Sequence, residues 1–401
     1  MRKWIKILLG LIAILIIAAG IFALTPMGRD VIKIFNLSGD LQTAKITDTQ
    51  VYNPQITIGE KCTATPLAAP DAPLDEALTA ALAQAQAYSE EQSGVGLIVM
   101  KDGALIHESY ADGGAADQPT LSYSMHKSLM ALAIGIAIND GVLGSLDDPI
   151  ESYIEEWADE PRGAITLRQL LNMESGLELT GPMTLEGMRL VLGNDINSIA
   201  LDKELTAEPG TEFTYNNANS QIVGIALDRA LKKSGGKGYA SFLEQKIWCP
   251  AGNNAAALWY DSDPEDGGTP RYYAGVFSNL SNWARIGELI RNQGQVAGAE
   301  VVPADWIEAM SEPAPTNPNY GLHVWLDAPE DGKRAYSQSS KVTVPHSAPY
   351  LAEDVMFFDG FGGQRVYIVP SAGITIARAG QVNFAYDDAK IVNLVLEALA
   401  Q

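Results

Sequence analysis

The spacing of apolar residues changes along the chain, from short β-like runs near both ends to helical spacing in the middle. Lys101-Asp102-Gly103 separates two runs rich in apolar residues, and a D-G turn between such runs predicts a hairpin. Runs of the same kind return late in the chain. The predicted strands cover 94–100, 104–110, 321–326, 354–358, 364–369 and 373–379.

Helical spacing dominates between about Leu143 and Gly298, and it also borders the strand-rich parts. The predicted helices cover 74–88, 165–172, 221–233, 281–292 and 386–400, and a further helix carries the apolar run 128–138, with Ser124 at its first turn. Because helices are inserted between two groups of strands, we expect one sheet assembled from both ends of the chain and a helical lobe at its side. The predicted fold class is therefore α/β in the α+β sense. Clefts between such lobes often hold active sites.

The N-terminal stretch is the most apolar part of the chain. As a helix, Trp4 to Leu24 would be about 31 Å long, which matches a hydrocarbon core of about 30 Å. Basic residues lie only at its N-terminal end, so we predict a single-pass inner-membrane anchor with the rest of the chain on the extracytoplasmic, periplasmic side. A cleaved signal peptide is the alternative, because Ala18-Ala19-Gly20 offers a cleavage site and the chain would then be secreted.

The next segment, 25–70, carries four prolines and lacks sustained periodicity. We interpret it as a linker or extension between the N-terminal segment 1–24 and a main domain over 71–401, whose helical lobe covers about 143–298. Cys62 and Cys249 would join this extension to the main domain if they formed a disulfide. Two free buried thiols explain the cysteines equally well.

Composition excludes some partners. The 401 residues are 47% hydrophobic and carry a net charge of −22. Phosphate backbones bind to basic surfaces, so no nucleic-acid partner is expected. Two cysteines and four scattered histidines show no zinc-ligand spacing, so we expect no metal and no other cofactor. The oligomeric state is left open.

One tetrapeptide, Ser124-Met125-His126-Lys127, combines a nucleophile with a base. Residues at i and i+3 share a helical face, so the lysine amine can reach the serine hydroxyl. The lysine can act as a base only if burial or a nearby cation lowers its pKa. In isolation an ordinary helix N-cap explains Ser124 equally well. A second S-x-x-K, Ser234 to Lys237, lies in a Gly- and Lys-rich stretch typical of a helix exit.

Two later motifs carry further candidate chemistry. Tyr215-Asn216-Asn217 is a Y-x-N in a loop before a helix, where a phenol could relay a proton if a nearby cation lowered its pKa; a buried loop tyrosine is the alternative. Gly360-Phe361-Gly362-Gly363-Gln364 precedes a strand whose edge N–H could help hold an oxyanion, together with the Ser124 N–H; a tight turn is the alternative. For Leu170 to Leu177 we favour a packing role.

Taken in order, these motifs resemble the serine β-lactamase and D-Ala-D-Ala peptidase superfamily, and they are most similar to its branch of 6-aminohexanoate-oligomer hydrolases and class-C-like esterases. The resemblance covers about 71–401. It implies an antiparallel sheet flanked by helices with an inserted all-helical lobe. It also implies roles for single residues: Ser124 as nucleophile, Lys127 as its base, Tyr215 as proton shuttle, Asn217 as the second-motif amide, and Phe361, Gly362, Gly363 and Gln364 as oxyanion and substrate contacts.

One departure from the family pattern affects the expected substrate. The third motif of β-lactamases and peptidases opens with Lys or His, whereas Phe361 stands here. We therefore expect a serine hydrolase acting on a small-molecule ester or linear amide. Arg365 and Arg378 could still receive a carboxylate, although surface pairing is the favoured interpretation. The rival hypotheses are a penicillin-recognising D-Ala-D-Ala carboxypeptidase or β-lactamase, and a catalytically dead binding protein tethered to the membrane.

Overall fold

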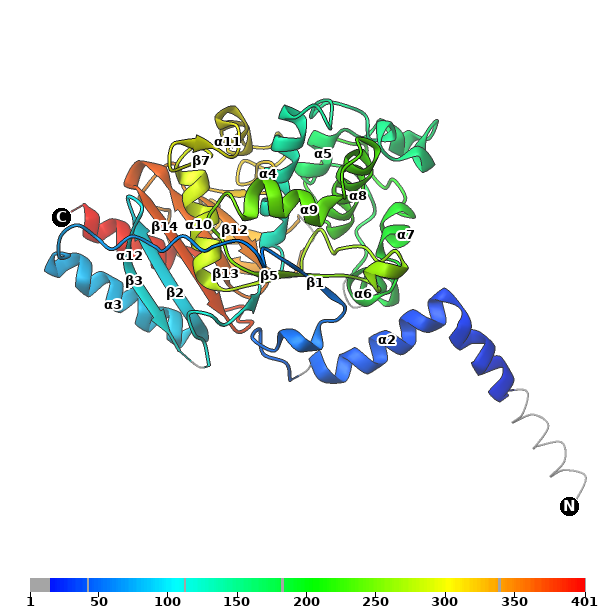
Figure 1. Ribbon diagram of the computed structural model, residues 1–401, viewed down its shortest axis with the longest axis horizontal. Helices are drawn as coiled ribbons and strands as arrows, with labels where there is room; N and C mark the ends of the chain where they lie inside the picture. Colours follow the sequence, from blue (N-terminus) through cyan, green and yellow to red (C-terminus); the bar gives the residue numbers. More distant parts are fainter. Residues whose placement is uncertain (1–14, 42, 112, 182–183, 338–339, 401) are drawn as a thin grey trace, which may run out of the picture.

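A six-stranded antiparallel sheet forms one half of the molecule in the computed structural model, which describes residues 15–41, 43–111, 113–181, 184–337 and 340–400 (Figure 1). In spatial order its strands are β3 (Ala104–Tyr110), β2 (Gly94–Lys101), β14 (Ile374–Gly380), β13 (Gln364–Val369), β12 (Met356–Gly360) and β9 (Trp325–Leu326). Because β14 pairs with β2, both ends of the chain build this sheet, as predicted.

Helices cover both faces of the sheet. α3 (Glu76–Glu91) and α12 (Asp388–Leu399) pack against each other, and their apolar sides join the core on one face. α10 (Leu280–Arg291) packs on β14, β13 and β2, with its apolar side in the larger core cluster. Each helix presents one apolar stripe, which is what helical spacing of apolar residues predicts.

The helical lobe lies beside the sheet (Figure 1). Its helices are α4 (Met125–Asn139), α5 (Leu167–Leu171), α6 (Leu185–Leu192), α7 (Ile196–Leu201), α8 (Asn217–Lys233) and α9 (Tyr239–Leu243). Because α10 packs on the six-stranded sheet, the helical lobe ends before the expected boundary near 298. The elements that complete the C-terminal half are β7 (Gln295–Val296), β8 (Ala299–Glu300), α11 (Ala304–Met310), β10 (Lys333–Ala335) and β11 (Thr343–Pro345).

The strand predicted over 321–326 is much shorter than expected. Only Trp325 and Leu326 pair with β12. His323 has a φ of 55°, in the left-handed region, which ends extended backbone before β9.

A second, four-stranded sheet includes the segment that we interpreted as a linker. Its order is β1 (Gln55–Ile58), β5 (Ala256–Trp259), β6 (Val276–Ser278) and β4 (Thr120–Leu121). α2 (Pro26–Leu41) precedes β1 and packs on α6. Asp30 of α2 is buried and accepts hydrogen bonds from Arg189 Nε and the Asn194 N–H, both at 2.8 Å. The extension is therefore folded onto the main domain.

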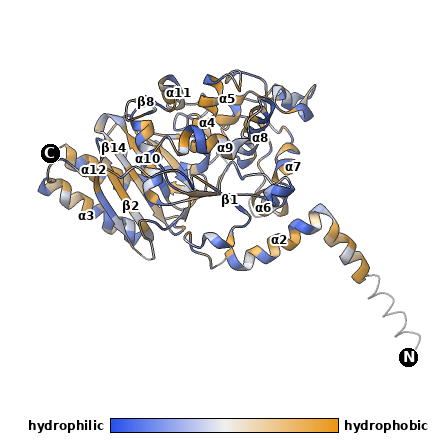
Figure 2. Cartoon of the chain, viewed as in Figure 1, coloured by the Kyte–Doolittle hydropathy of each residue, from blue (hydrophilic) through white to orange (hydrophobic). Residues whose placement is uncertain are grey.

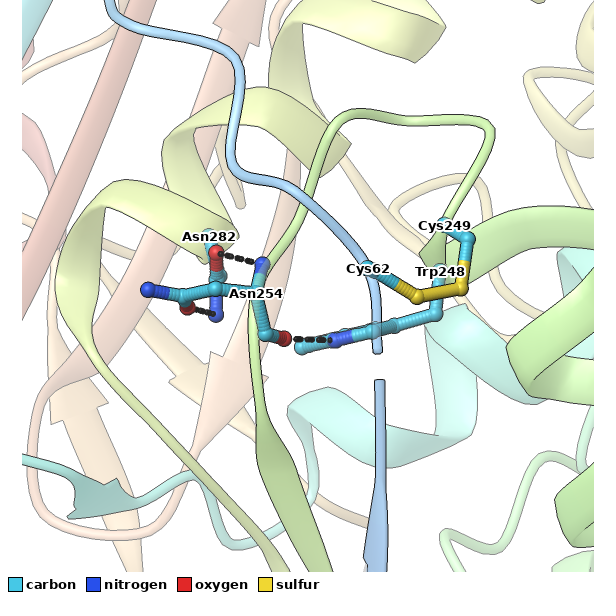
Figure 3. The surroundings of a disulfide bond; sticks show 5 residues. All are labelled: Cys62, Trp248, Cys249, Asn254 and Asn282. Atoms are coloured by element: carbon cyan, nitrogen blue, oxygen red, sulfur yellow. Dashed lines mark hydrogen bonds between the residues drawn. A yellow bond between two sulfur atoms is a disulfide. The ribbon is translucent and has the colours of Figure 1, made fainter. Parts of the chain in front are cut away.

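Cys62 and Cys249 form a disulfide, which decides between the two alternatives for these residues. Figure 3 shows the bond beside Trp248, whose indole donates to the Asn254 carbonyl oxygen at 2.6 Å. The bond ties the extension to the end of the helical lobe. In the described part of the chain, one group of side chains has the spacing of a metal site, but it consists of Glu244 and these two bonded cysteines.

The predicted membrane span lies partly outside the described residues. In the part that is described, no single helix is long and apolar enough to cross a membrane. Leu15–Leu24 and Pro26–Leu41 meet the length and composition criteria only together, and they are bent by 91° at their junction. Figure 2 shows that the stretch before α2 is almost wholly apolar.

Candidate active site

The turn into α4 is strained and positions Ser124. β4 ends at Leu121, and the Ser122 N–H donates to the Val276 carbonyl oxygen at 2.9 Å. Tyr123 then adopts a φ of 47°, which is unusual for a bulky residue. Ser124 occupies the N-cap position of α4, but its side chain makes no capping hydrogen bond. The ordinary N-cap interpretation is therefore wrong, and the hydroxyl is free to contact other groups.

Lys127 contacts the Ser124 hydroxyl. Its side chain is almost fully buried, with 1% of the residue exposed. The Nζ atom donates to Ser124 Oγ at 3.0 Å, to Asn217 Oδ1 at 2.8 Å and to the Tyr273 carbonyl oxygen at 2.9 Å. Burial lowers the pKa of Lys127 to about 7, while the negative charge of Asp359 acts in the opposite direction. A large fraction of the amine is therefore neutral at neutral pH.

Tyr215 contacts both the serine hydroxyl and the lysine amine. Its ring centre is 4.9 Å from Lys127 Nζ, and its hydroxyl forms a hydrogen bond with Ser124. Burial raises the pKa of Tyr215 well above its usual value, the charge of Asp359 raises it further, and the bond with Ser124 acts against both. The condition that a nearby cation lowers the phenol pKa is therefore not met, because burial and the charge of Asp359 outweigh the bond with Ser124 and the charge of Arg334. Tyr215 can relay a proton only as a neutral phenol.

The loop that carries Tyr215 is held by the Leu170–Leu177 segment. The Thr214 N–H donates to the Met173 carbonyl oxygen at 2.8 Å, and the Gly210 N–H donates to that of Glu174 at 2.7 Å. Glu174 is itself buried and accepts from the Thr316 hydroxyl at 2.6 Å. These contacts agree with the packing role favoured for this segment.

The two asparagines of the Tyr215-Asn216-Asn217 motif have different roles. Asn216 caps α8, because its side chain accepts from the Ala218 N–H at 3.0 Å. Asn217, the first residue of α8, accepts from Lys127 instead. The first turn of α8, which Asn216 caps, therefore contacts Lys127 through Asn217.

The Gly-rich motif is a hairpin turn rather than a strand. Gly360 pairs with Gln364 at the end of β12 and β13, and Gly362 and Gly363 have φ values of 77° and 101°. A methyl group added at Gly360 would collide with the Ser122 carbonyl oxygen, so this turn lies directly against the nucleophile turn. The rings of Phe361 and Tyr123 are 5.8 Å apart.

Gln364 does not face the site as expected. It is buried, and its amide donates to the Gly380 carbonyl oxygen at 2.6 Å and accepts from the Gly380 N–H at 2.9 Å. Since both ends of the amide bind β14, Gln364 holds the turn and is not available for substrate. The predicted residues that converge are therefore Ser124, Lys127, Tyr215 and Asn217, with Phe361 beside them.

This arrangement can be compared with known proteins. The beta-lactamase family model matches residues 77–399. The chain belongs to the beta-lactamase family. It is 23% identical over 271 residues to the 6-aminohexanoate-dimer hydrolase of Paenarthrobacter ureafaciens, covering 64% of this chain and 66% of that protein, which is just under two thirds of its length.

Solved structures show the same fold in this beta-lactamase family member. A Bacillus anthracis structure described as a candidate 6-aminohexanoate-dimer hydrolase superposes with a TM-score of 0.67 at 17% identity, over 88% of this chain and 92% of that one. A family VIII carboxylesterase superposes with a TM-score of 0.60 at 17% identity, over 84% and 98% of the two chains. The family and its neighbours are hydrolases, including esterases and amide hydrolases.

Arg365 and Arg378 do not pair at the surface in this family member. Both are fully buried. Arg365 contacts Asp359 and Asp388, each at 2.7 Å, and Arg378 donates to the carbonyl oxygens of Gly363 and Gln92, each at 2.6 Å. The interpretation as surface pairs is wrong. Because both guanidinium groups already bind protein oxygens, they are also poorly placed to bind a substrate carboxylate.

A buried charge cluster near the site was not predicted from the sequence. Arg334 of β10 contacts Asp359 at 2.8 Å and Asp388 at 3.0 Å, and Arg365 completes the group. Tyr336 donates to Asp359 at 3.0 Å. The members come from β10, β12, β13 and α12, so no local spacing relates them. The carboxylate of Asp359 acts on the pKa of both Lys127 and Tyr215.

The N-terminal extension also reaches the nucleophile turn. The Leu121 N–H donates to the Ile46 carbonyl oxygen at 3.0 Å. Tyr52 forms a side-chain hydrogen bond with Tyr123 and packs on Trp259 and Phe277, with ring centres 5.1 and 5.5 Å away. The residue before Ser124 is thus held by the segment whose sequence predicts a linker or extension.

Proposed function

We propose that this chain is a serine hydrolase that cleaves an ester or linear amide through an acyl-enzyme on Ser124. The observation that carries the proposal is the 3.0 Å contact between Lys127 Nζ and Ser124 Oγ, made by a buried amine whose pKa is lowered to about 7. A neutral amine at that distance can accept the serine proton, which an ordinary surface lysine cannot do at neutral pH.

The proposed reaction has two halves. In the first, Ser124 Oγ attacks the substrate carbonyl carbon while Lys127 takes the hydroxyl proton. The oxyanion is held by the Ser124 N–H and a backbone N–H of the Phe361 turn. The C–O or C–N bond then breaks, and the proton passes through the neutral Tyr215 hydroxyl to the leaving alcohol or amine. In the second half, water gives a proton to Lys127 and attacks the acyl carbonyl. The C–Oγ bond then breaks, Lys127 returns that proton to Ser124 Oγ, and the acid is released.

Two features favour neutral substrates over β-lactams and peptidoglycan. Phe361 stands where the family's carboxylate-binding Lys or His would be expected, and Arg365 and Arg378 are committed to buried partners. A penicillin-recognising enzyme remains the rival hypothesis. A fluorescent penicillin that forms a stable adduct with Ser124, at a rate above that of ester hydrolysis, would favour the rival.

The decisive experiment uses a fluorophosphonate probe, which reacts with activated serines. We expect labelling at Ser124, shown by peptide mass spectrometry, and no labelling of Ser124→Ala or Lys127→Met. Wild-type protein that is folded yet unlabelled would support the catalytically dead binding protein instead.

We also propose that the hydrolase domain is exported and stays attached to the cell envelope by its N-terminal segment. The disulfide between Cys62 and Cys249 supports export, because such bonds persist in oxidising compartments. The net charge of −22 argues against nucleic acid as a partner. Membrane fractionation and protease digestion of spheroplasts test the location: a domain that is cleaved after lysis but not in intact spheroplasts would contradict it.

A further inference from the structure

Three exposed apolar side chains form a ridge beside the site. Phe361, Val382 and Phe384 are 44%, 40% and 50% exposed, in contrast to the fully buried Phe357 and Phe358 of β12. The rings of Phe361 and Phe384 are 5.1 Å apart, and a methyl group added at Gly362 would collide with Val382. Exposed apolar clusters of this kind mark binding surfaces. We call these three residues the apolar ridge.

The ridge is built on a fixed backbone. Its two segments are joined by the Asn383 N–H, which donates to the Gly362 carbonyl oxygen at 3.1 Å. Gln381 donates its N–H to the Ser93 carbonyl oxygen at 2.8 Å, and its side chain accepts from the Ile46 N–H at 3.1 Å. Three separate parts of the chain therefore fix the backbone that carries these side chains before any ligand binds. Such preorganisation reduces the entropic cost of binding.

The position of the ridge relative to the site indicates which part of a substrate it contacts. Phe361 packs against Tyr123, the residue before Ser124. The leaving group must reach the Tyr215 hydroxyl, and Tyr215 packs on Trp325 and Tyr336 rather than on the ridge, with ring centres 5.7 and 5.3 Å away. If the leaving group lies near Tyr215, the acyl part of the substrate is the part that contacts the ridge.

We infer that the apolar ridge binds an apolar acyl chain of the substrate. The preferred substrates are then esters or amides of acids with several methylene groups, rather than acetyl compounds. This inference rests on the proposed function, because it places the chain on the carbonyl that Ser124 attacks. Each methylene group that is fully removed from water contributes about fourfold to binding.

The test compares p-nitrophenyl octanoate with p-nitrophenyl acetate on the full-length chain in detergent. We expect the wild type to prefer octanoate in kcat/KM. Phe384→Ser should lower the octanoate-to-acetate ratio about tenfold. Val382→Thr, which keeps the side-chain shape, should lower it less. Leu351→Ser is the matched control, because Leu351 is 62% exposed and lies beside Asn393 of α12; its ratio should equal that of the wild type.

Two results would overturn the inference while leaving the proposed function intact. One is an unchanged ratio in both ridge variants, with Ser124 still labelled by the fluorophosphonate. The other is a preference that follows the length of the alcohol in octyl acetate rather than that of the acid in ethyl octanoate. A wild-type protein without ester turnover or labelling would overturn both the ridge and the serine hydrolase, so the two failures are distinguishable.

Discussion

At the scale of single residues, the site separates chemistry from stability. Ser124 stands at a helix N-terminus without capping it, whereas Ser128, one turn later, donates to the His323 carbonyl oxygen at 2.6 Å. Two serines on one helix therefore have opposite expected effects. The first carries the proposed reaction, and the second joins α4 to the loop before β9.

Replacing these two serines tests that separation. Ser124→Ala should lower kcat by more than about 10³-fold with little change in the free energy of unfolding. Ser128→Ala should destabilise by about 1 kcal/mol and keep most of the activity. Ester turnover and urea unfolding of both variants provide the check. A Ser124→Ala protein as active as the wild type would refute the assignment of the nucleophile.

The pKa of Lys127 predicts how activity depends on pH. Its proposed role requires the neutral amine, and burial lowers its pKa to about 7. Activity should therefore fall as pH drops through 7 and level off above it. Lys127→Arg should be inactive at every pH, because a guanidinium stays protonated. The pH profile of kcat/KM for a neutral ester measures this. A profile that is flat from pH 5 to pH 9 would contradict the assignment of the base.

At the scale of secondary-structure elements, the buried charge cluster joins β10, β12, β13 and α12 behind the site. Arg334, Asp359, Arg365 and Asp388 are each at most 3% exposed. Removing one member of such a group leaves its partners buried without compensation. The two arginines hold the pKa of Asp359 below its usual value against the effect of burial. This stabilisation is present above the ordinary carboxyl pKa and is lost as pH falls through the lowered value.

Asp359→Asn should therefore destabilise the protein by about 3–5 kcal/mol near neutral pH. Glu156→Gln is the control, since Glu156 pairs with Arg229 at 2.6 Å on the surface, and it should cost less than about 1 kcal/mol. Urea unfolding at pH 7 compares the two variants. Equal losses would show that burial of the cluster contributes nothing specific to stability.

At the scale of the whole molecule, the N-terminal extension belongs to the folded domain. Ile34 of α2 lies in a small core cluster with Tyr52, Leu121, Trp259 and Phe277, and this cluster borders Tyr123. The same extension is bonded through Cys62 to the lobe. A domain boundary near 71 would divide this cluster and the second sheet.

A chain that begins at Ala44 should be less stable than one that begins at Pro26. The shorter chain exposes the partners of Ile34 and leaves Arg189 without Asp30, so we expect a loss of at least about 3 kcal/mol. Urea unfolding of the two proteins is the measurement, with the disulfide intact in both. Equal stability would mean that α2 is a dispensable appendage.

Much of the fold and the core of the site could be predicted because the relevant patterns are local. Helices and hairpins follow apolar spacing and turn residues, and the contact between Ser124 and Lys127 follows from three residues of separation on one helix. The failures concern segments whose conformation depends on distant partners. α2 is held by Asp30 and Arg189, β1 by β5, and the Gly360–Gln364 turn by Ser122 and Gly380.

The second S-x-x-K shows what sequence alone cannot decide. Ser234 and Lys237 have the same spacing as Ser124 and Lys127, but both are exposed, and the Ser234 hydroxyl donates to the Leu231 carbonyl oxygen at 2.8 Å. The sequence by itself determined the order of the motifs and the elements that carry them, because these depend on neighbours along the chain. Only the tertiary structure decided which lysine is buried, why the pKa of Tyr215 is raised and which groups Arg365 and Arg378 bind. The reason is that burial and charge act through space, between residues far apart in the sequence.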